Sequence, residues 1–278
     1  EPICDASMYN IRKLPFVPEG KTDRLKRCMD IFEMQVAGLK KRMSAAGNKL
    51  VIGVSGGLDS TLALIVTVNA FRKLGLDTKG IIAVTMPCFG TTNRTYTNAC
   101  RLAENYNTTL MEVNIRKSVL QHFEDIGQSE DVHDVTYENS QARERTQVLM
   151  DIANKKGGLV IGTGDLSELA LGWATYNGDH MSMYAVNTSV PKTLVKYLVR
   201  YEAGCSEDKL KAVLEDILDT PVSPELLPPD ENGTISQKTE DLVGPYELHD
   251  FFLYYMLRFG FSPSKIYRIA NIAFKDMY

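Results

Sequence analysis

The most constraining feature of the sequence is an apolar segment that runs directly into a glycine loop and a helix. Leu50–Val54 is continuously apolar, residues 55–60 are Ser-Gly-Gly-Leu-Asp-Ser, and an apolar helical stretch follows from Thr61 to Leu74. Two glycines at such a turn let backbone N–H groups point inward around an anion, and the start of the helix adds a favourable potential. The segment therefore predicts a strand, a phosphate-binding loop and a helix.

The alternation of strand and helix continues along the chain. Further strands are expected at residues 80–84, 109–113 and 158–164, and helices at 22–46, 92–105, from about 118, 139–156, 166–171 and from about 192. Repeated βα units favour a parallel sheet with helices on both faces. We therefore expect an α/β fold built on a doubly wound parallel sheet.

The two ends of the chain and one internal stretch differ from this pattern. Residues 1–20 contain three prolines and little periodicity, which indicates a linker or an arm lying on another domain. Residues 204–246 are rich in proline and are expected to form long loops. Residues 246–278 are expected to be helical, and the apolar run 251–257 is explained most simply by buried packing. The predicted organisation is thus an arm at 1–20 and one domain at 21–278.

Composition narrows the class of protein. The 278 residues are 44% hydrophobic with a net charge of −4, which excludes disordered chains and disfavours a general nucleic-acid binder. No apolar run approaches the roughly 20 residues of a membrane helix, so no membrane partner is expected. The five cysteines are scattered, which favours reduced thiols and a cytoplasmic location. The first residue is Glu1, and no signal peptide pattern follows, so we expect a fragment or a processed piece.

The acidic residue in the glycine loop points to a metal. Asp59 would repel a bare phosphate, so its presence makes sense if Mg²⁺ bridges it to the ligand. The loop lacks both the Gly-Lys-Ser/Thr ending of a Walker loop and the Gly-x-Gly-x-x-Gly of a dinucleotide fold. The alternative is an ordinary tight βα turn with an aspartate near the helix start.

The loop resembles that of the PP-loop ATP pyrophosphatases, which have Rossmann-like folds of the adenine nucleotide alpha hydrolase type and split ATP into AMP and pyrophosphate. That likeness leaves several enzymes open, among them GMP synthetase, argininosuccinate synthetase and NAD synthetase. The later segments resemble glutamine-dependent NAD synthetases; they are residues 136–145, 162–168, 171–176, 178–181, 190–194, 221–226 and 237–247.

This resemblance implies a set of site residues. The ATP-binding positions would be Gly53, Val54, Ser55, Gly56, Gly57, Leu58, Asp59, Ser60, Thr163, Lys192 and Ser223. The deamido-NAD positions would be Asn139, Arg143, Glu168, Trp173, Ala174, Thr175, Tyr176 and Asp179. Asp59 and Glu168 would hold Mg²⁺, and Asp59 and Lys192 would be the catalytic pair.

Several of these positions also have simpler explanations. In these explanations, Glu168 merely interacts with a helix N-terminus, Trp173 merely packs in the core, and Arg143 is a surface charge. Lys192 at a helix start is unfavourable for a cation unless it faces an anion, and a phosphate would supply one.

The resemblance implies ATP-dependent amidation of deamido-NAD to NAD by a ligase, with ammonia as the nitrogen source and a homo-oligomeric assembly. Relatives carry a glutaminase domain with a Glu-Lys-Cys triad, for which residues 1–21 leave no room, and a basic C-terminal tail that this chain does not reach. We therefore expect an excised, C-terminally truncated synthetase domain that uses ammonia only. The alternatives are a nucleotide-binding or assembly module without turnover, and another PP-loop amidotransferase such as GMP synthetase.

Overall fold

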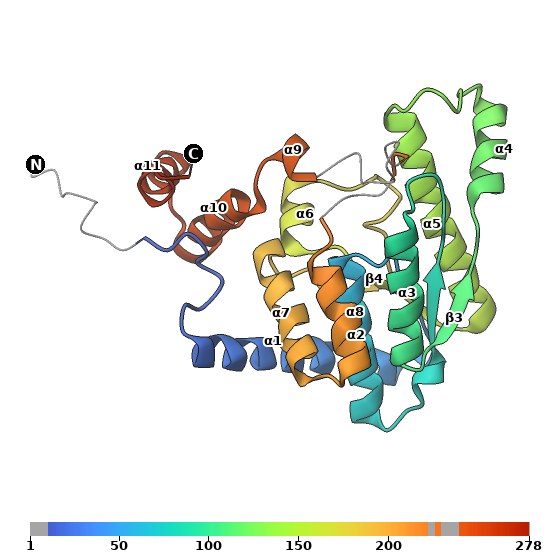
Figure 1. Ribbon diagram of the computed structural model, residues 1–278, viewed down its shortest axis with the longest axis horizontal. Coiled ribbons are helices and arrows are strands. Elements are labelled where there is room, and N and C mark those ends of the chain that lie inside the picture. Colours follow the sequence, from blue (N-terminus) through green and yellow to red (C-terminus); the bar gives the residue numbers. More distant parts are fainter. Residues whose placement is uncertain (1–10, 222–225, 229–238, 278) are drawn as a thin grey trace, which may run out of the picture.

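The protein is built on a five-stranded, fully parallel sheet with the strand order β3-β2-β1-β4-β5. The computed structural model describes residues 11–221, 226–228 and 239–277 (Figure 1). The strands are β1 (Leu50–Gly53), β2 (Ile81–Thr85), β3 (Thr109–Glu112), β4 (Leu159–Gly162) and β5 (Tyr184–Ala185). The helices are α1 (Lys21–Ala46), α2 (Leu58–Leu74), α3 (Asn93–Asn105), α4 (Arg116–Ile126), α5 (Val135–Lys156), α6 (Leu166–Leu171), α7 (Lys192–Cys205), α8 (Asp208–Leu218), α9 (Thr239–Val243), α10 (Tyr246–Phe259) and α11 (Pro263–Ala273), with a 3-10 turn at Thr78–Gly80.

Helices cover both faces of the sheet, as the alternation of strand and helix predicts. Side chains of successive strand residues point to opposite faces, so Leu50 and Ile52 pack in the core with α2 and α7, whereas Val51 packs with α4 and α5. In Figure 1 the α4 and α5 helices stand on the right of the sheet, and α1, α7 and α8 lie on the other side. The expected doubly wound α/β fold is confirmed.

The order of the strands positions the loops of interest. β1 pairs with β2 on one side and with β4 on the other, so the chain changes direction across the sheet at β1. In open α/β sheets ligands bind at such a switch point, beyond the carboxyl ends of the strands. The loops after β1 and β4 meet there, and both contain sequence motifs that predict ligand binding.

The expectation that residues 204–246 are mainly loops is wrong in part. Residues Asp208–Leu218 form α8, whose Val213, Leu214 and Ile217 are buried. Prolines and a glycine further along the stretch obscured this amphipathic segment, because they raise the average loop propensity of the whole region. A second, short helix, α9, lies at Thr239–Val243, while residues 222–225 and 229–238 lie outside the described residues.

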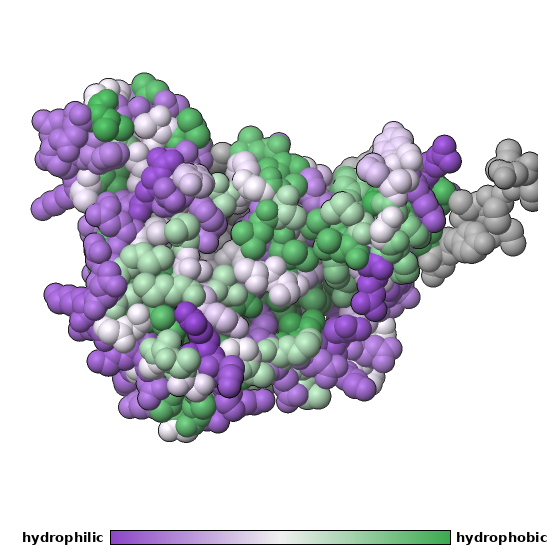
Figure 2. Space-filling view, turned by 180° about the vertical axis from the view of Figure 1, so that it is seen from behind, coloured by the Kyte–Doolittle hydropathy of each residue, from purple (hydrophilic) through white to green (hydrophobic). Residues whose placement is uncertain are grey.

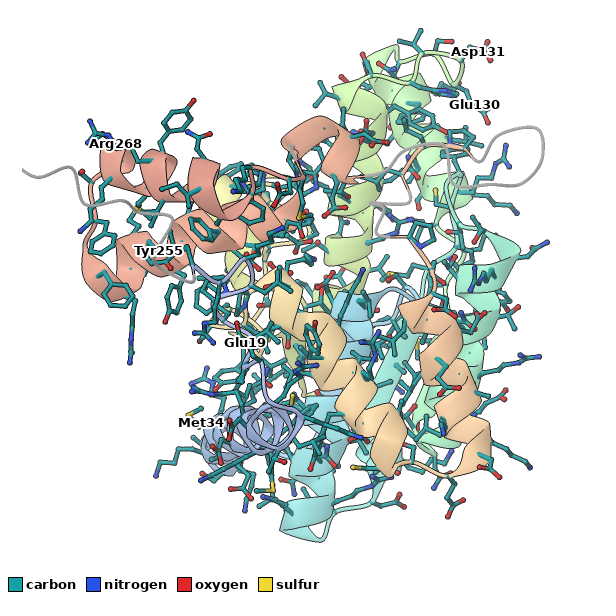
Figure 3. All side chains as sticks on the ribbon, turned by 60° about the vertical axis from the view of Figure 1, so that its left-hand side comes forward. Glu19, Met34, Glu130, Asp131, Tyr255 and Arg268 are labelled. Carbon is teal, nitrogen blue, oxygen red and sulfur yellow. The ribbon has the colours of Figure 1, made fainter. Side chains whose placement is uncertain are left out.

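The last two helices form a separate apolar cluster at one end of the molecule. Figure 3 shows α10 and α11, which carry Tyr255 and Arg268, standing apart from the sheet. Phe251 is fully buried, but Phe252, Met256 and Leu257 are 37%, 51% and 62% exposed, so the expectation of buried packing holds only for part of the 251–257 run. A helix presents only one face to its neighbour, which explains this division.

Residues 11–20 lie against the same domain. Phe16 makes an edge contact with Tyr254 of α10 at 5.1 Å between ring centroids, and Val17 is buried in the main core. Figure 2 shows apolar residues gathered across the middle of one face, with hydrophilic residues along much of its edge. Among the described residues, no helix has both the length and the apolar character needed to cross a membrane.

Candidate functional site

The loop after β1 is held by hydrogen bonds between its own residues. The hydroxyls of Ser55 and Ser60 lie 3.2 Å apart, and the N–H of Gly57 donates to Ser55 Oγ at 3.2 Å. Gly56 has a φ of +87°, and a Cβ there would lie 2.2 Å from the carbonyl oxygen of Thr95. Glycine at this position is therefore required both by the backbone conformation and by the close approach of α3. The loop leads into the start of α2, whose first backbone N–H groups are free of intrahelical bonds.

Asn187 connects the loops that follow β1 and β4. Its fully buried Nδ2 donates to the backbone carbonyls of Asp59 and Thr163, both at 3.0 Å, and its Oδ1 accepts from Gln35 at 3.2 Å. Because Asp59 follows β1 and Thr163 follows β4, one side chain fixes the spacing of both loops.

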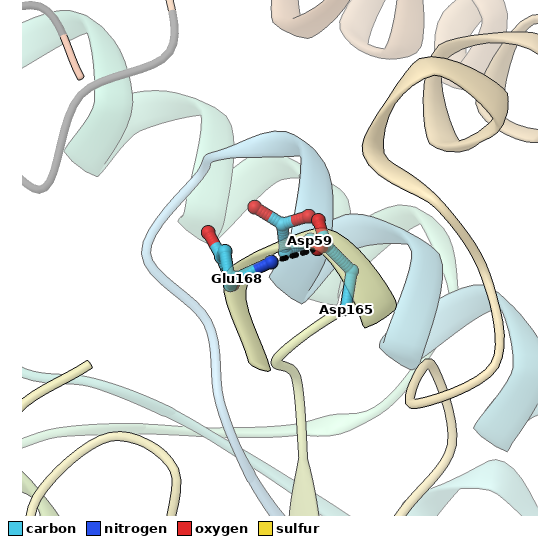
Figure 4. A group of neighbouring side chains, drawn as sticks. All are labelled: Asp59, Asp165 and Glu168. Carbon is cyan, nitrogen blue, oxygen red and sulfur yellow. Dashed lines mark hydrogen bonds between the residues drawn. The ribbon is translucent and has the colours of Figure 1, made fainter. Parts of the chain in front are cut away.

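A buried lysine and three carboxylates lie at the centre of the site. Nζ of Lys192 lies 2.7 Å from Asp59 Oδ2, 2.7 Å from Asp165 Oδ2 and 2.8 Å from Glu168 Oε1. Asp165 also caps α6, since its Oδ1 accepts from the backbone N–H of Glu168 at 2.9 Å, the bond drawn in Figure 4. The Lys192 side chain is only 5% exposed, so these interactions occur largely away from water.

The charges of this group shift its titration. Burial, and then the neighbouring carboxylates, raise the pKa of Asp165 to about 8 and that of Glu168 to about 7, against the opposing effect of Lys192. Burial alone would lower the pKa of Lys192, but the three carboxylates raise it well above its usual value. The two carboxyl shifts thus arise chiefly from burial, and the Lys192 shift arises from the three carboxylates around it.

The residues present fit a divalent cation. Oxygens of Asp59, Asp165 and Glu168 lie within 4.8 Å of one another, and hard cations prefer carboxylate oxygens. Oδ1 of Asp59 is buried and has no hydrogen-bond partner among the described residues, so it is available as a ligand. Asp165 was not among the predicted metal ligands. An aspartate before a short helix is explained locally as a cap, and only its contact with Lys192 reveals the second role.

A cavity of about 250 Å³ opens beside this group. Its walls include seven of the predicted ATP and metal positions, namely Gly53, Val54, Ser55, Asp59, Ser60, Thr163 and Glu168, together with Trp173 and Asp179 from the predicted deamido-NAD set. Gly56, Gly57, Leu58 and Lys192 do not line the cavity, and both Leu58 and Lys192 are buried. Ser223 lies outside the described residues.

The remaining predicted deamido-NAD positions meet in one neighbouring cluster. Thr175 donates through its hydroxyl to Asn139 Oδ1 and through its N–H to Asp179 Oδ1, both at 2.8 Å. Nε of Arg143 donates to the carbonyl of Tyr176 at 3.1 Å. Helix α5 and the 173–180 turn are thereby joined, with Tyr176 75% exposed and Ala174 exposed.

Asn187 and Tyr246 also adjoin the site and were not among the predicted site residues. Tyr246 places its ring 5.3 Å from Lys192 Nζ. The available signal for Asn187 was a lone amide within an apolar stretch, and for Tyr246 its place in a segment with family resemblance. Neither signal identifies a contact, because the partners lie far away in sequence: Asn187 bonds to Asp59, and Tyr246 lies beside Lys192.

A parallel sheet with the glycine loop after β1 at its switch point gives the chain a Rossmann-like fold of the PP-loop type. The chain belongs to the NAD synthase family, whose family profile matches residues 31–275. The expected resemblance is thus confirmed.

Two curated relatives show the extent of the similarity. The chain is 44% identical over 277 residues to the glutamine-dependent NAD(+) synthetase of Mycobacterium bovis, with 97% of this chain and 40% of that protein covered. It is 31% identical over 265 residues to the protein of the same name from Acinetobacter baylyi, with coverages of 94% and 46%. The chain therefore spans less than half the length of these relatives.

Solved structures share the fold. A glutamine-dependent NAD+ synthetase from Acinetobacter baumannii, in complex with ADP, matches with a TM-score of 0.63 and 26% identity, covering 86% of this chain and 41% of that one. An NMN synthetase from Francisella tularensis matches with a TM-score of 0.69 and 24% identity, covering 90% and 94%, which supports the fold alone.

Proposed function

We propose that this chain catalyses the ATP-dependent amidation of deamido-NAD to NAD. The observation that carries the proposal is the meeting of Asp59, Asp165, Glu168 and Lys192 beside the glycine loop, in a member of the NAD synthase family. ATP would occupy the cavity next to this loop, with its phosphates at the first turn of α2. Deamido-NAD would approach from the side of Trp173 and the 174–179 turn.

In the first step, a nicotinate carboxylate oxygen attacks the α-phosphorus of ATP. The bond from that phosphorus to the α,β-bridging oxygen breaks, pyrophosphate leaves, and an acyl adenylate remains. The leaving pyrophosphate gains negative charge, so the step needs cations and N–H donors held in place beforehand. Lys192 and the start of α2 supply both, and no protein nucleophile is needed.

Mg²⁺ is the cofactor that the donor set fits best, with Asp59 and Glu168 as the principal ligands and Asp165 beside them. When bound, it would neutralise phosphate charge and orient the oxygens for in-line displacement. Asp165 and Glu168 would then stay ionised, because the added positive charge offsets the burial that raises their pKa values.

In the second step, ammonia attacks the carbonyl carbon of the adenylate. The carbon–oxygen bond to AMP breaks, AMP leaves, and the nitrogen loses a proton to water or to a second ammonia to give the amide. Only unprotonated ammonia has the lone pair for this attack, so the rate at fixed total ammonium should rise with pH. The cavity walls would have to exclude water, which hydrolyses the anhydride.

The family match favours this reaction over that of another PP-loop amidotransferase such as GMP synthetase. A binding or assembly module without turnover is the remaining alternative. A homo-oligomer and a glutaminase partner domain stay predictions, as does a cytoplasmic location, which rests on the scattered cysteines.

The direct test incubates the purified 278-residue chain with ATP, Mg²⁺, deamido-NAD and ammonium, and measures products by chromatography. We expect one AMP and one pyrophosphate for each NAD formed. Glutamine in place of ammonium should yield neither NAD nor glutamate. Formation of ADP and phosphate would contradict the proposal, and tight ATP binding without any turnover would favour the binding module.

A further inference from the structure

Helix α7 begins without a capping group of its own. Its N-cap residue is Pro191, which has no side-chain acceptor for the first N–H groups of the helix. Two side chains from elsewhere take over this role. The N–H of Lys192 donates to Ser167 Oγ at 2.9 Å, and the N–H of Thr193 donates to Asp250 Oδ2 at 2.8 Å.

Asp250 links this helix start to a second one. Its other oxygen, Oδ1, accepts from the hydroxyl of Ser167, so both carboxylate oxygens are engaged. Ser167 is the second residue of α6 and is fully buried, while Asp250 belongs to α10 and is 1% exposed. One buried carboxylate from a distant helix thus joins the N-termini of α6 and α7.

The anchored residues are direct neighbours of the charged ones. Ser167 precedes Glu168, and Thr193 follows Lys192, while Glu168 Oε1 and Lys192 Nζ lie 2.8 Å apart beside the glycine loop. Any shift of one helix start against the other changes this distance. Asp250 therefore controls the relative position of the two charged groups although its carboxylate bonds to neither side chain.

The chemistry of Asp250 suits this role better than it suits simple packing. A buried carboxylate is costly unless hydrogen bonds and nearby positive potential compensate it. The Ser167 hydroxyl, the Thr193 N–H and the N-terminus of α7 provide this compensation. An apolar residue of similar size would fill the space without linking the helices.

We propose that Asp250, acting through Ser167 and Thr193, is a positioning residue that holds Lys192 and Glu168 in the geometry required to bind Mg²⁺–ATP. The inference rests on the proposed function for its kinetic consequences. It also makes a statement about ATP binding that can be tested without turnover.

Asp250→Ala and Ser167→Ala each remove one part of the link. We expect the KM for ATP and the calorimetric Kd of Mg²⁺–ATP to rise about 10- to 100-fold, the range that follows from displacing a positioned group by about an ångström. The KM for deamido-NAD should change less than the KM for ATP, because hydrogen bonds of Thr175 with Asn139 and Asp179 also hold the 173–179 turn. Asp250→Asn should restore most of the ATP affinity, since its oxygen can accept from Thr193 and its amide can donate to Ser167 Oγ.

A purely structural role would give a different pattern. Loss of folded protein lowers kcat in proportion and leaves both KM values intact. Glu202→Ala provides the matched control: it removes another partly buried carboxylate, at the far end of α7, where Glu202 Oε1 accepts from Tyr106. Its KM for ATP should be that of the wild type, whatever its loss in melting temperature.

The outcomes separate the two proposals. If folded Ser167→Ala and Asp250→Ala bind Mg²⁺–ATP as the wild type does, the positioning role is wrong. If Asp250→Ala fails to fold, the smaller Ser167→Ala change decides the question alone. If the wild type makes no NAD, the proposed function fails, while a weakened ATP Kd in these variants would still support the role of Asp250.

Discussion

Nζ of Lys192 lies 2.7 Å from Oδ2 of Asp59, although 133 residues separate them in the chain. The contact joins the first turn of α2 to the start of α7 across the switch point of the sheet. The lysine is also paired with Asp165 and Glu168. Among the ion pairs of the described residues, it is the one cation that contacts three carboxylates.

Removal of the positive charge of Lys192 should destabilise the folded protein. Lys192→Met keeps much of the side-chain volume but leaves buried carboxylates unpaired, so we expect a loss of about 3–5 kcal/mol in the free energy of unfolding. Urea unfolding without Mg²⁺ measures this loss, and added Mg²⁺ should recover part of it by binding the native state. Lys196→Met, at an exposed position of the same helix, is the control and should change little. A loss equal to that of the control would contradict the buried-pair interpretation.

Asp59→Asn tests the metal site with a neutral side chain of the same shape. The amide oxygen can still accept a bond from Lys192, so the fold should persist, but a metal ligand charge is lost. We expect Mg²⁺-dependent ATP affinity to fall about 10- to 100-fold, a range typical of altered metal environments. Calorimetric ATP titrations at several Mg²⁺ concentrations measure the effect, with exposed Asp151→Asn as control. Unchanged Mg²⁺ dependence would remove Asp59 from the site.

The local parts of the fold could be predicted from sequence because their signals lie within a few residues. The expected helix at 166–171 agrees with α6, since Asp165 caps one end and Gly172 takes the left-handed conformation at the other. The glycine loop is equally local. Helix α8 was missed because prolines further along the stretch dominate the average, although its own buried residues have helical spacing.

The candidate site is less accessible to sequence reasoning, because most of its defining contacts are non-local. Asp165 serves as a helix cap within its own segment, and its pairing with Lys192 depends on how α6 and α7 meet. Asn187 is a single amide, and nothing nearby in sequence indicates that it bridges the Asp59 and Thr163 carbonyls. Such roles follow from the strand order, which the sequence pattern leaves open.

Gly56 provides a test of the loop geometry. An alanine there would meet the positive φ of +87° and the Thr95 carbonyl oxygen at 2.2 Å, whereas Gly75, with a φ of +67°, has nothing within 4 Å. Gly75→Ala should lower the free energy of unfolding by about 1–2 kcal/mol, because alanine is strained in the left-handed conformation. Gly56→Ala should lower the free energy of unfolding by about 1–3 kcal/mol more, because the new Cβ overlaps the Thr95 carbonyl oxygen. It should also weaken ATP binding. Equal losses in urea unfolding would show that the loop tolerates a wider separation from α3.

Glu202 should give the protein a measurable pH dependence of stability. Burial raises its pKa, against the opposing effects of its hydrogen bonds with Tyr106 and Asn69 and of Arg72. The folded state then binds this proton more tightly than the unfolded state, so the stabilisation is present at low pH and is lost as pH rises through the raised pKa. As pH rises from the unfolded-state pKa of about 4 through the raised folded-state pKa, the wild type should lose stability relative to Glu202→Gln. A stability curve of Glu202→Gln that runs parallel to that of the wild type across this pH range would contradict the raised pKa.

Trp173 offers a spectroscopic test of where deamido-NAD binds. It is the only tryptophan, it is partly buried at the cavity wall, and its backbone N–H donates to the carbonyl of Glu168 at 2.9 Å. Binding of a nicotinate ring and its ribose beside the indole would change the polarity and stacking around it, so deamido-NAD should alter the emission more than ATP alone does. Trp173→Phe should abolish this signal while retaining an aromatic wall, and calorimetry can establish saturation independently. An emission spectrum that stays constant at saturating deamido-NAD would mean that the indole only fills the protein interior, and the substrate would then have to bind elsewhere along the cavity.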